Sequence, residues 1–306
     1  MARRPSLDEL DLSLGKRTRL HRLLYEHGPG NGTALFLPID QGMEHGPIDF
    51  FPNPPSANAD YQCRLAREGG YSGIVFHVGL ASKYMRDYAG TVPLILKLNG
   101  KTNIPSDAEA FSAQDSSVED AVRLGADAVG YTLYVGSPSQ DRDLLQLRRV
   151  RADCDRYAMP LIIWSYPRGS AVEAKGGRDS IYAVDYAARL ADELGADIVK
   201  LNVPKFRDPR NEDSPAPYRR LYQAWKGLDD NQAYALAVEK VIASAGKTMV
   251  LFSGGSRISD EDLLEKARIC MEAGATGLIF GRNMWQRPFE EGLAITRKVK
   301  DLLLGF

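Results

Sequence analysis

The chain has 306 residues, of which 44% are hydrophobic and 26% are charged, and its formal net charge is −1. This composition is typical of a globular protein with a full core, and the near-zero charge argues against a protein that attracts nucleic acid or anionic membranes. The longest apolar runs, of about eight residues, are too short to cross a membrane. The three cysteines are far apart and the N-terminus is charged, so we expect a cytoplasmic protein without a disulfide framework.

Short β-rich runs alternate with helical patterns along most of the chain. A helical pattern around Lys16–His27 comes first, and we expect residues 1–33 to form an extension that covers the closed end of a barrel or makes an oligomer contact. Amphipathic stretches such as Asp179–Leu194 and Asp260–Ala273 predict helices, the second with a capping start at Ser259. Eight strands are predicted, at Ala34–Asp40, Gly73–Gly79, Pro93–Gly100, Ala128–Gly136, Pro160–Pro167, Asp197–Val203, Thr248–Gly255 and Gly277–Arg282.

Eight βα units in a chain of this length predict an α/β fold, a TIM (β/α)8 barrel over residues 34–306. The alternative is a doubly wound open sheet, but the first strand ends in Asp40-Gln41-Gly42 and lacks the glycine-rich phosphate turn of that fold. Two segments after strands, 42–58 and 204–218, are predicted to be long loops on the carboxyl-terminal face, where they would form lids or substrate walls.

Lys200 lies within an apolar, β-branched run, Ala196–Val203, that predicts a buried parallel strand. Lysine is rarely buried without a reason. Burial lowers the pKa of a lysine, and a neutral amine attacks carbonyl carbons, so one hypothesis is a Schiff-base nucleophile. The alternative is a lysine at a strand end that reaches solvent or pairs with a carboxylate.

Residues two apart in a strand share a face, and this rule brings polar side chains together at the barrel mouth. We expect Lys97 to lower the pKa of Lys200 by like-charge repulsion, Asp40 to exchange protons with a substrate hydroxyl, and Tyr166 to act as an acid or base. The alternatives are an ion pair between Asp40 and Lys97, and core roles for Trp164 and Tyr166. The residues placed at the mouth are Asp40, Lys97, Asn99, Trp164, Tyr166, Arg168, Lys200 and Asn202.

The last two predicted strands end in glycines. Ser253-Gly254-Gly255 and Gly281-Arg282 are in the positions where TIM barrels frequently bind phosphate through backbone N–H groups. Glycine lets the backbone approach the anion, and an arginine adds a charged fork. The alternative is that these glycines only allow tight turns.

Four histidines are present, and none is spaced as a metal-binding pair, so we expect no metal and no other cofactor. His45 follows the first strand near the mouth and is expected to contact substrate. His77, in the second strand, is expected to be a core histidine with its hydrogen bonds satisfied.

Over residues 33–300 the chain resembles the archaeal-type class I fructose-1,6-bisphosphate aldolases. The resemblance implies that Lys200 forms a Schiff base with dihydroxyacetone phosphate at C2, that Tyr166 moves the proton at C3, and that Asp40 serves the C4 hydroxyl and the carbinolamine. It also implies a homo-oligomer whose substrate is a phosphorylated sugar. The matching segments are Leu37–Gly46, Pro93–Asn99, Ala128–Ser137, Trp164–Arg168, Ala196–Lys200, Ser253–Gly255 and Gly281–Arg282.

By the same resemblance, Trp164 shapes the pocket and Gly254, Gly255, Gly281 and Arg282 hold one phosphate, while Arg168 is a candidate for the second. Related Schiff-base barrels that act on other phosphorylated ketones, as transaldolase-like synthases or thiolase-type enzymes, are the nearest alternative. A non-catalytic phosphosugar-binding barrel is a further one, although it has no need for Lys200, Tyr166 and Asp40 together. A class II metal aldolase is disfavoured by the few histidines.

Overall fold

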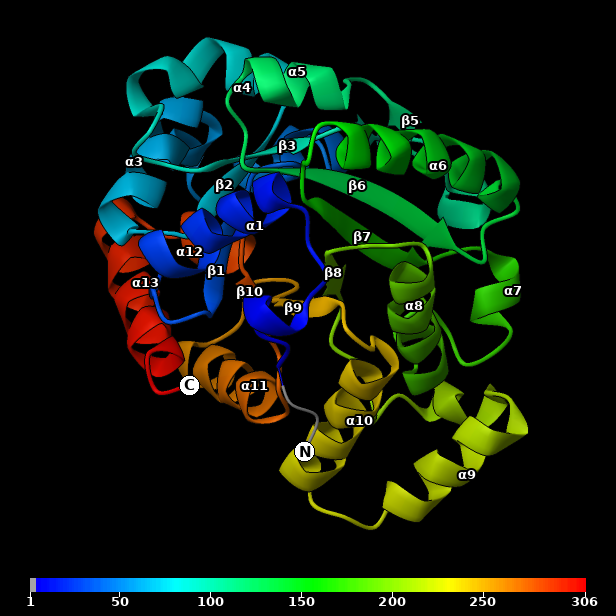
Figure 1. The fold of residues 1–306 in the computed structure, drawn as a ribbon. Coiled ribbons are helices and arrows are strands. Elements are labelled where there is room, and N and C mark those ends of the chain that lie inside the picture. The colour runs from blue at the N-terminus through cyan, green and yellow to red at the C-terminus, as the bar shows by residue number, and fades with distance from the viewer. Residues whose placement is uncertain (1–3) are drawn as a thin grey trace.

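The computed structural model describes residues 4–306 and contains a closed barrel of eight parallel strands within a ring of helices (Figure 1). Around the barrel the strands run β1-β10-β9-β8-β7-β6-β3-β2, so chain neighbours are barrel neighbours. The TIM (β/α)8 barrel predicted from the sequence is confirmed. The strands are β1 Ala34–Pro38, β2 Gly73–His77, β3 Leu94–Lys97, β6 Ala128–Val135, β7 Leu161–Pro167, β8 Ile198–Leu201, β9 Met249–Ser253 and β10 Gly277–Ile279.

Thirteen α-helices lie in the described part of the chain, and the longer ones form the outer ring (Figure 1). The side-chain oxygen of Ser259 accepts a hydrogen bond from the Asp262 N–H at 3.1 Å, which confirms the cap predicted for that helix. The helices are α1 Leu14–His21, α2 Gln41–Glu44, α3 Ala59–Gly69, α4 Val78–Tyr84, α5 Val118–Arg123, α6 Gln140–Arg156, α7 Ser170–Glu173, α8 Ile181–Glu193, α9 Ala216–Trp225, α10 Asp230–Ser244, α11 Asp260–Glu272, α12 Arg282–Trp285 and α13 Phe289–Leu303.

Two apolar layers follow from the alternation of side chains along each strand. In β7, Ile162 and Trp164 point into the barrel interior, while Ile163 packs between the strands and the surrounding helices. The interior is therefore a packed core, and only its carboxyl-terminal rim is free for polar groups.

The N-terminal segment covers the amino-terminal end of the barrel. Leu20, Leu23 and Leu24, from α1 and the π-helical turn Arg22–Glu26, belong to the same apolar cluster as the inward-facing strand residues. Two carboxylates at the starts of strands, one half-buried and one buried, hold this segment: Lys16 Nζ lies 3.0 Å from Asp197, and Arg22 Nη1 lies 2.8 Å from Asp127. Covering a barrel end is one of the two roles expected for this segment.

The predicted strand at Pro93–Gly100 is wrong in its last part. β3 ends at Lys97, and Asn99–Gly100 (β4) pairs instead with Ala113–Gln114 (β5) in a separate antiparallel sheet. The cause is Asn99, whose buried side-chain amide takes the place of a peptide group. It accepts from the Thr132 N–H at 2.7 Å and donates to the Thr132 carbonyl at 2.9 Å, so its backbone is free to leave the barrel.

The two segments predicted as long loops contain helical turns. The first holds α2 and 3₁₀ turns at Pro47–Phe50 and Pro54–Ala57, and the second holds a 3₁₀ turn at Pro209–Asp213 and the start of α9. Proline opens each of these 3₁₀ turns, because its fixed φ suits the first helical position and its missing N–H is not needed there. Within residues 4–306, no helix is long and apolar enough to span a membrane.

Candidate active site

The carboxyl ends of the barrel strands surround a cleft of about 680 Å³. All the side chains predicted for the site except Trp164, Lys97 and Asn99 line it, and these three are fully buried. The alternation rule therefore placed the expected side chains together. The predicted residues on the wall are Asp40, His45, Tyr166, Arg168, Lys200, Asn202, Ser253, Gly254, Gly255, Gly281 and Arg282.

Lys200 lies on β8 directly beside Trp164 of β7. Its side-chain Nζ is 5.1 Å from the centroid of the Trp164 ring and 5.5 Å from that of Tyr166, and the residue is 5% exposed. Among residues 4–306 it forms no ion pair or hydrogen bond through Nζ within the usual distances. This excludes the alternative of a lysine paired with a carboxylate.

Burial is the main cause that lowers the pKa of Lys200, and the positive charge of Arg282 acts in the same direction. The negative charges of Asp40 and Glu44 oppose the shift without cancelling it. The expectation that Lys97 supplies the like charge is wrong, because Lys97 is itself paired: its Nζ lies 2.8 Å from Glu44 Oε1.

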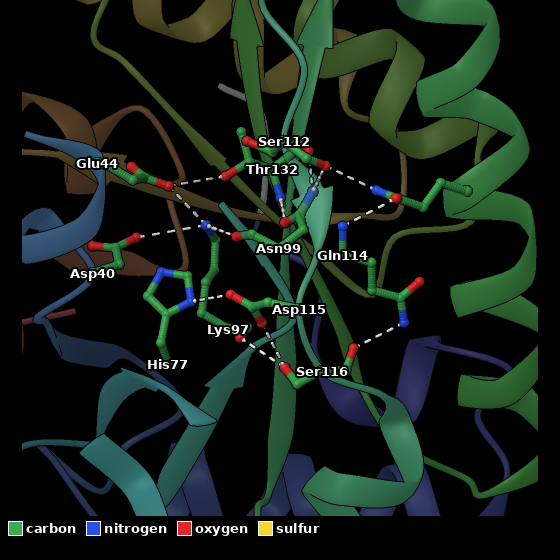
Figure 2. A network of polar contacts seen from close by, with 11 residues as sticks. Asp40, Glu44, His77, Lys97, Asn99, Ser112, Gln114, Asp115, Ser116 and Thr132 are labelled. Carbon is green, nitrogen blue, oxygen red and sulfur yellow. Dashed lines mark hydrogen bonds and ion pairs between the residues drawn. The ribbon is translucent and has the colours of Figure 1, made fainter. Parts of the chain in front are cut away.

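Asp40 and Glu44 lie four residues apart on the first turn after β1, so both carboxylates point to the same side (Figure 2). Asp40 Oδ2 is 3.9 Å from Lys97 Nζ, and within the described chain it accepts no hydrogen bond. Burial raises the pKa of Asp40, but Lys200, Lys97 and His77 outweigh that effect and hold the pKa below its ordinary value. Asp40 is therefore an ionised carboxylate at the cleft, with one oxygen, Oδ2, that has no hydrogen bond within residues 4–306.

His77 stands beside this group and is bonded at only one ring nitrogen (Figure 2). Nδ1 lies 3.0 Å from Asp115 Oδ2, while Nε2 is buried without a hydrogen-bond partner among the described residues. The expectation of a fully satisfied core histidine is wrong for that second nitrogen. Asp115 also accepts from the Ser116 hydroxyl at 2.9 Å, which fixes the carboxylate behind the ring.

Tyr166 follows Trp164 on the same face of β7, and this half-buried residue lines the cleft. Burial raises the pKa of Tyr166 well above its usual value, and the nearby Glu44 and Asp40 charges add to the shift. The phenol is thus a proton donor at neutral pH. The Arg168 guanidinium lies 5.4 Å from the centroid of the Tyr166 ring and donates to Asp107 at 3.1 Å.

The loops after β9 and β10 are held together by Asn283. Its side-chain amide donates to the Gly254 and Ser256 carbonyls at 3.3 Å and 3.2 Å, and its oxygen accepts from the Ile258 N–H at 3.0 Å. No side chain fits at Gly254, where a Cβ would lie 2.8 Å from the Asn283 amide nitrogen. Gly281 is close-packed in the same way, since a Cβ there would lie 2.8 Å from the Gln41 amide nitrogen, whereas Gly255 faces open space at a φ of +70°.

Arg282 and His45 share a carboxylate at the rim of the cleft. His45 Nδ1 lies 2.7 Å from Asp49 Oδ2, and Arg282 Nη1 lies 3.9 Å from the same oxygen. The segment that follows β1 is thereby joined to the loop after β10. Ser253, on the opposite side of that loop pair, donates its hydroxyl to Asn202 at 2.9 Å.

Several residues of the cleft escaped the sequence analysis. Glu44 had a signal, since it follows Asp40 by one helical turn. Lys101, Asp107 and Arg178 had none, because they lie in connecting segments whose course strand alternation does not describe. Within residues 4–306, no three His, Cys, Asp or Glu side chains are arranged to hold a metal ion.

Comparison with known proteins gives consistent similarities. A model of the DeoC/LacD family of aldolases matches residues 34–287. The class 1 fructose-bisphosphate aldolase of Thermoproteus tenax is 41% identical over 275 residues, which cover 90% of each chain. The corresponding enzyme of Halobacterium salinarum is 35% identical over 257 residues, which cover 84% of this chain and 86% of that one.

A solved structure of an archaeal fructose-1,6-bisphosphate aldolase, with its catalytic lysine covalently bound to the carbinolamine intermediate of the substrate, is similar along its whole length. The TM-score is 0.76 at 38% identity, and the match covers 94% of this chain and 100% of the other.

Proposed function

This chain belongs to the DeoC/LacD family of aldolases, and we propose that it is a class I aldolase that reversibly cleaves fructose 1,6-bisphosphate into dihydroxyacetone phosphate and glyceraldehyde 3-phosphate. The observation that carries the proposal is Lys200, a buried amine with a lowered pKa and no ion-pair partner among residues 4–306. The similar archaeal structure, in which the catalytic lysine holds a carbinolamine, supports the same chemistry.

The first steps join the sugar to the lysine. The neutral Lys200 amine attacks the C2 carbonyl carbon, and the resulting carbinolamine loses its hydroxyl as water to give a protonated Schiff base. Asp40, whose carboxylate faces Lys200, passes the protons that this dehydration needs. Trp164 limits the position of the amine from below, because its ring lies 5.1 Å from the Nζ.

Cleavage follows from the charge states of the two other groups. Asp40 is ionised, so it accepts the proton of the C4 hydroxyl as the C3–C4 bond breaks and its electron pair moves into the Schiff base as an enamine. Glyceraldehyde 3-phosphate then leaves. Tyr166 holds its proton because its pKa is raised, so it protonates the enamine at C3, and water releases dihydroxyacetone phosphate from Lys200.

The phosphates are assigned to opposite sides of the cleft. Ser253, Gly254, Gly255, Gly281 and Arg282 hold the C1 phosphate, which is adjacent to the carbon that Lys200 attacks. Arg168, whose guanidinium lies 5.4 Å from the Tyr166 ring centroid, is assigned to the C6 phosphate. His45 is assigned to substrate contact at the cleft wall, and the fully buried Lys97 holds Glu44 there. A cytoplasmic location and a homo-oligomeric assembly, both expected from the sequence, stay predictions.

The test is to incubate the protein with dihydroxyacetone phosphate and borohydride in the presence of a chelator, and to map the adduct by mass spectrometry. We expect a reduced adduct on Lys200, and none in a folded Lys200→Met variant. Phosphosugar binding without an adduct would favour a non-catalytic barrel. An adduct without cleavage of fructose 1,6-bisphosphate would favour a related Schiff-base enzyme with another ketose.

A further inference from the structure

One carboxylate at the outer edge of the cleft holds three cations from three different segments. Asp107 Oδ1 lies 3.0 Å from Lys101 Nζ, and its Oδ2 lies 3.1 Å from Arg168 Nε and 3.3 Å from Arg178 Nη1. All four side chains line the cleft that contains Lys200 and Tyr166. None of this cluster except Arg168 takes part in the proposed reaction.

The cluster carries more positive charge than its carboxylate neutralises. Burial raises the pKa of Asp107, but Lys101, Arg168 and Arg178 outweigh it and hold the pKa below its usual value, so the carboxylate is ionised. Three cations and one anion leave an excess of two positive charges. A phosphate monoester carries about −1.5 to −2 charges near neutral pH, which matches that excess better than a second carboxylate would.

The positions of the four groups differ in a way that favours exchange of the anion. The side chains of Lys101 and Arg168 are 15% and 17% exposed, whereas those of Asp107 and Arg178 are 41% and 46% exposed. Asp107 begins a single 3₁₀ turn, Asp107–Glu109, in the connection between β4 and β5. Lys101 and Arg168 are therefore the buried part of the cluster, and Asp107 and Arg178 meet them from the exposed rim.

We propose that Asp107 is a counter-ion that competes with the C6 phosphate of the substrate for Lys101, Arg168 and Arg178, and thereby sets how strongly the enzyme prefers bisphosphates to monophosphates. This rests on the proposed aldolase function. Without substrate, Asp107 keeps the three cations together against their mutual repulsion. A dianionic phosphate satisfies all three more fully and takes their hydrogen bonds, whereas a neutral hydroxyl at C6 does not.

The test compares the Asp107→Asn variant with the wild-type protein on two ketoses at one ionic strength. For fructose 1,6-bisphosphate we expect the KM of the variant to fall about threefold to tenfold, the range for loss of several partly exposed charge contacts, with kcat unchanged within about twofold. For fructose 1-phosphate, which lacks the second phosphate, KM should stay the same. Glu109→Gln, the same charge change at an exposed residue of the same turn, is the matched control and should alter neither KM.

A higher KM of the variant for fructose 1,6-bisphosphate, or an equal change for both ketoses, would overturn the proposal and leave Asp107 a purely structural residue. A second readout needs no turnover: inorganic phosphate should raise the Tm of Asp107→Asn more than that of the wild type, because the glycine-loop site is the same in both. If Asp107→Asn does not fold, Arg178→Gln must raise KM for the bisphosphate alone. Failure of the aldolase function itself would be visible separately, as absence of cleavage by the wild type.

Discussion

Lys97 and Lys200 approach the same indole ring, with their Nζ atoms 5.5 Å and 5.1 Å from the Trp164 centroid, yet only Lys97 meets a carboxylate. Lys97 Nζ lies 2.8 Å from Glu44 Oε1 and donates to the Asn99 carbonyl at 3.0 Å. Lys200 has no such partner in residues 4–306, and its burial favours the uncharged amine. Two chemically identical side chains beside one ring thus differ in their partners: Lys97 is held by Glu44 and by the Asn99 carbonyl, whereas Lys200 is held by neither.

The Lys200→Met variant should lose turnover, since no other amine of the cleft is both buried and unpaired in the described chain. The expected loss in kcat is at least about 10⁵-fold, as for removal of a covalent nucleophile. The measurement is the initial rate of fructose 1,6-bisphosphate cleavage. Lys226→Met, at an exposed lysine paired with Glu212, is the control and should keep wild-type activity. Retained activity in Lys200→Met would remove the central claim.

The same variant should be more stable than the wild type at neutral pH. Burial lowers the pKa of Lys200 below 10.5, so between the lowered pKa and 10.5 the folded protein binds fewer protons than the unfolded one. The free energy of unfolding of the wild type therefore rises with pH in that window. Urea unfolding at several pH values should show that the free energy of unfolding of Lys200→Met exceeds that of the wild type by less and less as the pH approaches 10.5. A constant difference would mean that the amine is not destabilised by burial.

Tyr166→Phe should slow the reaction by about 10²–10⁴-fold, the usual contribution of general acid–base catalysis. The phenyl ring keeps the packing against Lys200 and Arg168, so Schiff-base formation should survive. Borohydride trapping of dihydroxyacetone phosphate on Lys200 measures that step, and exchange of the C3 proton measures the step that Tyr166 serves. Normal proton exchange would move this role to another residue.

Arg282→Ala should weaken binding of phosphorylated ketones about 10-fold to 100-fold, the usual effect of losing a charge-assisted hydrogen bond. Binding of unphosphorylated dihydroxyacetone should be weakened much less. The KM values of both substrates measure the difference. Equal losses would argue against a phosphate contact and would point instead to the link between Arg282 and Asp49.

Asn99→Ala should lower the free energy of unfolding by about 2–3 kcal/mol, because the Thr132 N–H and the Thr132 and Ser112 carbonyls lose their partner in a buried site. Chemical unfolding measures the change. Asn231→Ala, which removes one exposed contact with Glu265, is the control and should cost much less. If both variants lose the same free energy of unfolding, the Asn99 amide is not needed to stabilise the pairing of β3 with β6.

Strand alternation predicts the inward groups of this barrel well because a parallel strand repeats every two residues whatever surrounds it. Lys200, Trp164 and Tyr166 were placed correctly for that reason. Alternation fails where a side chain makes the hydrogen bonds that the strand backbone would otherwise make. At Asn99 the side-chain amide bonds the Thr132 backbone, so β3 ends early, at Lys97. Alternation also fails for Asp107, whose place depends on the antiparallel pair β4–β5 and on contacts with residues more than 60 positions away.

Charge pairing was harder to predict than position. The sequence contains Asp40, Glu44 and Lys97 but does not show which carboxylate lies closer to Lys97. In the structure the helical turn after β1 brings Glu44 to 2.8 Å from Lys97 Nζ and leaves Asp40 at 3.9 Å. The polarity of the cleft could be predicted, but the sign of each neighbour's effect on Lys200 depends on distances of a few ångströms. That is why Arg282, the first residue of α12, replaces Lys97 as the charge that repels Lys200.

The ion pair between Lys16 and Asp197, 181 residues apart, bears on the order in which the chain folds. During synthesis α1 leaves the ribosome long before Asp127 and Asp197 have been made. β1 can pair with its second neighbouring strand only after β10 has been made. The helix that is made first can therefore dock only after most of the strands have been made. Contacts of such long sequence separation are slow to form, so docking of α1 is expected among the latest folding events. The start of the strand that carries Lys200 gains its last anchor at that point.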